Sequence, residues 1–242
     1  YAGPAVIETF GEPGFEPVNK SEAWAFTEKQ QNLYLEYRNL SMPVVNEYIP
    51  GDETSFTIIA FPVPAIGEHF PEIFKETIRI NTLDYELYRD MQQKIIDVLD
   101  TAEYVEVIGK GENRTNMQVR LAALSDPEKQ TKFENCVADV NIPLGEVFTS
   151  PKLAGTNGIL NVGTVYIGDI QYRNLLMEFK DGRVVSAVCD NFAENGEIDK
   201  EAGHRLIVQG IMNGHETLPL GEFAIGTNTT AYAMAEKFGI LD

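Results

Sequence analysis

The sequence predicts a mixed α/β (α+β) fold, with an α/β front segment over residues 1–126 and a β-rich domain over 127–242. Apolar residues recur at helical spacing between 81 and 100, whereas runs of β-forming residues dominate after 127. A chain of 242 residues with 43% hydrophobic content is also long and apolar enough to bury a core without disulfides.

The front segment opens with a predicted helix over 23–40, which Ser21 can cap. A short strand over 56–61 follows, because this segment is rich in β-forming residues and is ended by Pro62 and Pro64.

The clearest predicted helix lies between 81 and 100, with Asp84 and Glu86 in its first turn, where the helix dipole favours acidic side chains. Its apolar residues recur at steps of three and four, and we expect them to pack in the core rather than to form a partner groove. They are Leu83, Leu87, Tyr88, Met91, Ile95, Val98 and Leu99.

The strands that follow are predicted over 104–108, 115–124, 159–167, 170–179, 184–189 and 221–225, the last of them as a short buried strand. Asp181-Gly182 predicts a hairpin turn between two of them. Helices over 199–212, begun by Asp199, and over 229–238 complete the prediction.

The charge and the cysteines narrow the classes of function. There are 19 Lys and Arg against 37 Asp and Glu, a net charge of −18, and no basic cluster. This charge repels phosphate backbones and anionic membrane surfaces, so we expect neither nucleic acid nor a membrane as partner. Two cysteines, Cys136 and Cys189, make no disulfide framework and predict core thiols in a cytoplasmic protein.

The histidines form no zinc motif by themselves. His69, His204 and His215 make no His-x-x-x-His, His-x-His or Glu-x-x-His pattern, and each is expected to be an ordinary imidazole rather than a ligand. No Gly-x-Ser-x-Gly nucleophile elbow is present, and no catalytic residue can be assigned.

Two glutamates stand in unusual settings. Glu146 lies in the segment Asn-Ile-Pro-Leu-Gly-Glu-Val-Phe-Thr-Ser-Pro over 141–151, and Glu222 interrupts the apolar segment Leu-Gly-Glu-Phe-Ala-Ile over 220–225. A glutamate in such a segment must face solvent, find a hydrogen-bonded partner or bind a cation, because an isolated buried charge is very costly.

These segments, with the hairpin Glu-Phe-Lys-Asp-Gly-Arg-Val-Val over 178–185, resemble the thermophilic-type metallo-aminopeptidases, the family of aminopeptidases T and S. The resemblance covers roughly 109–225. It implies a site for two divalent cations, zinc or cobalt, in an enzyme that releases amino-terminal residues from peptides. It also implies that Glu146 and Glu222 are metal ligands in the β-rich domain, and that the protein is a homodimer.

The sequence departs from this family in its ligand set. Family members supply a Glu/His pair and a His-x-Asp segment after the region that matches Glu222, and neither occurs here. A catalytic zinc site normally has three protein ligands. We therefore expect the chain to be a fragment or a shortened relative that binds metal weakly and is inactive alone.

Two other readings remain open. In one, the glutamates are the acid and nucleophile of a glycoside hydrolase, which needs no metal and is insensitive to chelators. In the other, the chain is a non-catalytic binding or oligomerisation module derived from the aminopeptidase family, and both glutamates make structural hydrogen bonds.

Overall fold

The computed structural model describes residues 26–50, 58–137, 141–143, 145–167, 170–194 and 197–239. Its helices are α1 (Glu28–Tyr48), the 3-10 turn η2 (Pro64–Ile66), α2 (Phe70–Asn81), α3 (Tyr85–Leu99), α4 (Lys200–Gly210) and α5 (Thr229–Phe238). Its strands are β1 (Ile58–Ile59), β2 (Tyr104–Ile108), β3 (Asn116–Arg120), β4 (Glu134–Cys136), β5 (Asn141–Ile142), β6 (Glu146–Thr149), β7 (Lys152–Ile167), β8 (Ile170–Lys180), β9 (Arg183–Val188), β10 (Ala193–Glu194), β11 (Glu197–Ile198) and β12 (Phe223–Gly226). The predicted mixed α/β fold is confirmed.

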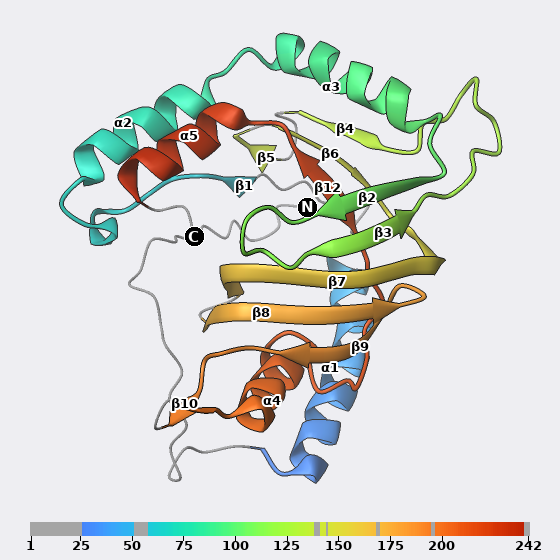
Figure 1. Ribbon diagram of the computed structural model, residues 1–242, viewed down its shortest axis with the longest axis vertical. Coiled ribbons are helices and arrows are strands. Elements are labelled where there is room, and N and C mark those ends of the chain that lie inside the picture. The colour runs from blue at the N-terminus through green and yellow to red at the C-terminus, as the bar shows by residue number, and fades with distance from the viewer. Residues whose placement is uncertain are drawn as a thin grey trace.

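Two antiparallel sheets organise the molecule (Figure 1). One has five strands in the order β2-β3-β7-β8-β9, and the other has three in the order β12-β6-β4. Helix α3 lies over the three-stranded sheet, α4 lies beside β9, and α2 and α5 lie side by side (Figure 1). The short strands β1 and β5 pair in parallel.

Local sequence signals explain where several elements begin and turn. The carboxylate of Asp84 accepts hydrogen bonds from the main-chain N–H groups of Glu86 and Leu87 at 3.1 and 3.2 Å and so caps α3. Asp199 caps α4 in the same way. Asp181 and Gly182 both have positive φ, 47° and 67°, as a tight hairpin turn between β8 and β9 requires.

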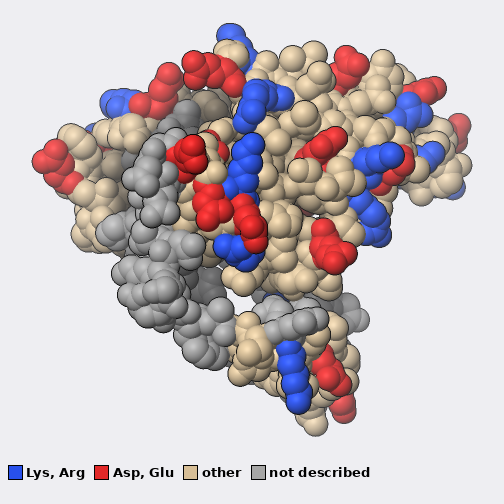
Figure 2. Space-filling model, turned by 60° about the horizontal axis from the view of Figure 1, so that its bottom comes forward, with Lys and Arg blue, Asp and Glu red and all other residues tan. Residues whose placement is uncertain are grey.

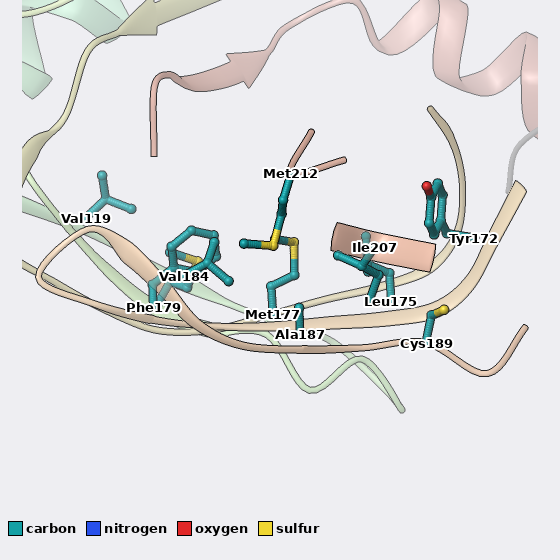
Figure 3. Close-up of a cluster of buried hydrophobic side chains, with 11 residues drawn as sticks. Val119, Tyr172, Leu175, Met177, Phe179, Val184, Ala187, Cys189, Ile207 and Met212 are labelled. Atoms are coloured by element: carbon teal, nitrogen blue, oxygen red, sulfur yellow. The ribbon is translucent and has the colours of Figure 1, made fainter. Parts of the chain in front are cut away.

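Two clusters of buried side chains form the core. The larger lies between the five-stranded sheet and α4, with Tyr172 and Cys189 at one end and Val119 and Phe179 at the other (Figure 3). The smaller lies between α3 and the three-stranded sheet. Phe223 of β12 packs against both clusters, so β12 connects the two halves of the core. The buried thiols of Cys136 and Cys189 confirm that both cysteines are core residues.

The expectation that the whole apolar stripe of α3 packs in the core is wrong for part of it. Leu87 and Val98 are 64% and 69% exposed and Met91 is also exposed, whereas Ile96 is 1% exposed. At about 3.6 residues per turn the predicted stripe covers somewhat less than half of the helix circumference, and the helix faces the sheet with one edge of that stripe rather than with its middle. The helix is rolled so that Gln92 and Ile96 point inward.

The front of the chain also differs from the prediction. Ser21 lies outside the described residues, and α1 is instead capped by Thr27, whose side chain forms a reciprocal capping box with Gln30. The helix continues past Pro43 to Tyr48, which shows that this proline is accommodated inside the helix. Residues 51–57 lie outside the described part, so the strand predicted over 56–61 appears only as β1.

Helix α2 was not predicted. Pro71 stands in its first turn, where the main-chain N–H that proline lacks has no partner within the helix, so this proline is compatible with the start of α2. The strand predicted over 221–225 exists as β12, but it is covered on one face only, because Ala224 and Gly226 are exposed. No helix in the described part of the chain has both the length and the apolarity that a membrane crossing requires.

Candidate functional site

Glu146 begins the central strand of the three-stranded sheet. It pairs with Gly226 of β12 on one side and with Cys136 of β4 on the other. The next residue, Val147, is fully buried in the smaller core cluster. Because side chains alternate along a strand, the half-buried Glu146 points to the opposite face of the sheet, away from α3.

Glu222 immediately precedes β12 and is exposed. Phe223 and Ile225 turn toward the core clusters, so the alternating positions Ala224 and Gly226 lie on the outer face. The exposure of Glu222 fits the same alternation. Both glutamates therefore belong to one face of the β12–β6 ladder, the face that the core does not cover.

The pairing register separates the two glutamates along this ladder. Gly226 is opposite Glu146, and Phe223 is opposite Thr149. Glu222 comes directly before Phe223 and four residues before Gly226, so it lies four residues along the strand from the position opposite Glu146. An offset of four residues corresponds to about 13 Å between the two Cα positions along the strands. The structure thus brings the glutamates to one face but places them at opposite ends of the ladder.

A buried polar cluster lies beneath the Glu146 end. Gln92 of α3 is 0% exposed and bonds to Thr227, Asn135 and the carbonyl of Cys136. Sequence reasoning missed this residue because a search for apolar side chains passes over glutamine. The signal that could have found it is its position between Tyr88 and Ile96, at four-residue steps on the inward face of the helix.

Among the described residues, no group of three or more His, Cys, Asp and Glu side chains is arranged so that it could hold a metal ion. His69 precedes α2, His204 places its Nδ1 2.9 Å from the carbonyl oxygen of Ala187, and His215 is exposed in a loop. Two carboxylates are hard oxygen donors that suit divalent cations, but a catalytic zinc site normally has three protein ligands. The described side chains therefore fit such a site only as part of a ligand set.

The surface charge is mixed in the view of Figure 2. Lys and Arg side chains alternate with Asp and Glu across this face and do not gather into a basic patch. A nucleic-acid interface normally concentrates basic residues on one face. This face has no such concentration.

Comparison with known proteins gives a family and a likeness to a solved structure. A family model described as thermophilic metalloprotease (M29) matches residues 25–236. No curated protein matches. Among solved structures, wild-type AmpT from Thermus thermophilus is similar at 18% identity, with a TM-score of 0.48, over 73% of this chain and 46% of that one. The present chain thus spans less than half of the AmpT chain.

Proposed function

Because the chain belongs to the thermophilic metalloprotease (M29) family, we propose that it carries part of the metal site of an aminopeptidase that releases amino-terminal residues from peptides. Glu146 and Glu222 are the proposed ligands for divalent cations, zinc or cobalt. Supporting this is the single observation that both glutamates lie on the same face of one β ladder, the face turned away from the described core.

We propose two ions rather than one, as the resemblance to the family implies. Glu146 and Glu222 would hold them from β6 and from the start of β12, whose offset places the two Cα positions about 13 Å apart along the strands.

The role of these residues is to bind and to balance charge. Glu146 and Glu222 would each bring one negative charge to the cations and hold them on the outer face of β6 and β12. When bound, divalent cations at such sites polarise a carbonyl group and lower the pKa of a bound water. Homodimerisation, a cytoplasmic location and the division at 126/127 remain predictions.

The test is cobalt binding to the 242-residue chain, measured by calorimetry and by paramagnetic broadening of backbone amide signals. In the wild type, Co²⁺ should broaden the signals of β6 and β12. Glu146→Gln and Glu222→Gln should each weaken binding by roughly tenfold or more, or about 1.4 kcal/mol. Glu178→Gln, which changes an exposed glutamate of β8, is the matched control and should leave the affinity unchanged.

Hydrolysis of an aminoacyl-anilide provides the activity arm. Any activity should be lost with a chelator and restored by zinc or cobalt. The binding-module alternative remains open because the described ligand set is incomplete. It would be supported if Glu146→Gln and Glu222→Gln lowered the free energy of unfolding while cobalt affinity stayed at the wild-type value, which would contradict the metal-ligand proposal.

A further inference from the structure

Gln92 is a glutamine in the interior of the protein with all its amide hydrogens used. Its Nε2 donates to the Oδ1 of Asn135 at 2.7 Å and to the carbonyl oxygen of Cys136 at 3.0 Å. Its Oε1 accepts from the hydroxyl of Thr227 at 2.7 Å. Because a buried amide is costly unless it is hydrogen-bonded, these partners determine where the side chain can lie.

The partners of Gln92 lie in β4 and directly after β12, the two strands that flank Glu146. Cys136 is the residue of β4 opposite Glu146, and Thr227 follows Gly226, the residue of β12 opposite Glu146. The main-chain N–H of Thr227 also donates to the carbonyl oxygen of Gly145 at 2.8 Å. One helical side chain thus connects the two neighbours of Glu146 at the level of the glutamate itself.

A further hydrogen bond connects β4 to α3 beside Gln92. Asn135 donates through Nδ2 to the carbonyl oxygen of Arg89 at 2.9 Å, one turn before Gln92. Thr227 is itself buried, so its hydroxyl has no access to water when the bond to Gln92 is lost. Removal of one member therefore leaves buried polar groups unpaired on both flanking strands.

We infer that Gln92 is a positioning residue, which holds β4 and β12 against β6 so that Glu146 presents its carboxylate to a divalent cation. The predicted effect on metal affinity rests on the proposed function. The claim that Gln92 holds the strands together does not depend on any metal. Gln92 acts through the strands and does not touch the cation.

The test compares four variants of the 242-residue chain. Gln92→Met keeps the length of the side chain and removes its hydrogen bonds, and Thr227→Val removes only the hydroxyl donor. Thr227→Ser keeps that donor and is the conservative rescue. Thr77→Val is the matched control, because Thr77 is also buried and donates its hydroxyl to a main-chain carbonyl at 2.8 Å, but in α2.

Two quantities are measured for each variant, the dissociation constant for Co²⁺ and the hydrogen-exchange rate of the Thr227 amide. Gln92→Met and Thr227→Val should weaken cobalt binding about tenfold, the low end of the loss seen when outer-shell partners are removed. Both should speed exchange at Thr227 relative to globally protected amides. Thr227→Ser and Thr77→Val should match the wild type in both.

The outcomes separate this inference from the proposed function. If Glu146→Gln leaves cobalt affinity unchanged, the proposed function fails, and the exchange rates alone then judge the role of Gln92. If Gln92→Met leaves the exchange of Thr227 no faster than Thr77→Val does, Gln92 does not hold these strands and the inference is wrong. Unchanged cobalt affinity in Gln92→Met, with Glu146→Gln impaired, would overturn it equally.

Discussion

The hydroxyl of Tyr172 is a buried polar group without a hydrogen-bond partner in the described core. The side chain is 0% exposed. Leaving a buried polar group unpaired costs about 1–3 kcal/mol. Burial, with a smaller contribution from Cys189, raises the pKa of Tyr172 from 10.0 to about 12.

Tyr172→Phe should therefore raise the free energy of unfolding at neutral pH by about 1 kcal/mol, because it removes the unpaired hydroxyl and keeps the ring. The pH dependence should change as well. Because the pKa of Tyr172 is about 12 in the folded state and 10.0 in an exposed tyrosine, the unfolded state loses this proton first as the pH rises. The free energy of unfolding of the wild type is therefore unaffected by the ionisation of this group below pH 10 and falls as the pH rises from 10 toward about 12. Urea unfolding at pH 7 and between pH 10 and 12 measures both, and the variant should lose less stability over the alkaline range.

Gly210 provides the control for this prediction. A Cβ at Gly210 would overlap the hydroxyl oxygen of Tyr172, whereas the ring carbon Cζ would be at 3.5 Å, an ordinary contact. Gly210→Ala should destabilise the wild type by about 1–3 kcal/mol through overpacking and should be close to neutral in the Tyr172→Phe background. If Gly210→Ala lowered the free energy of unfolding equally in both backgrounds, the overlap with the Tyr172 hydroxyl would not be the cause.

At the scale of elements, α3 shows that an apolar residue on an amphipathic helix is not automatically a core residue. Ile96→Ala should lower the free energy of unfolding by about 2–5 kcal/mol, because it opens a cavity in the smaller core cluster. Leu87→Gln should change it by less than about 0.5 kcal/mol, because this side chain is already in water. Chemical denaturation of both variants tests the orientation of the helix, and a large loss in Leu87→Gln would contradict it.

Element boundaries were predictable where local chemistry decides them. The strand predicted over 104–108 and the helix predicted over 229–238 agree with β2 and α5 at both ends. Asp84, Asp199 and the Asp181-Gly182 turn act over a few residues, so their effect can be read without knowing the fold. Helix α2 was missed because a proline disrupts the interior of a helix but is favoured in its first turn. Pro71 therefore indicates a helix only once the start of the helix at Phe70 is known.

At the scale of the whole molecule, the net charge of −18 acts on every element at once. Self-repulsion of like charges destabilises the compact state. Raising NaCl from about 10 mM to about 150 mM shortens the screening length from about 30 Å to about 8 Å and should raise the melting temperature. Choline chloride should have the same effect, since screening does not depend on the cation. Stabilisation by NaCl but not by choline chloride would instead indicate specific binding of sodium.

The five-stranded sheet joins strands from both parts of the sequence. Strands β2 and β3 come from the front segment, and β3 pairs with β7, the first of the three strands from the back. Glu146 and Glu222 were singled out by sequence, but their relation was not predictable from it. Their register depends on the pairing of β6 with β12, two strands separated by more than seventy residues of chain.

The sequence by itself determined the mixed α/β class, the clearest helices, the hairpin and the two glutamates in unusual segments. These features follow from periodicity, capping and turn chemistry, which operate between residues that are near neighbours in the chain. The tertiary structure decided which side of α3 is buried, that Gln92 lies beneath Glu146, and that the glutamates share a face at opposite ends of a ladder. Those relations depend on contacts between distant segments, where packing and hydrogen bonding of several elements together select one arrangement.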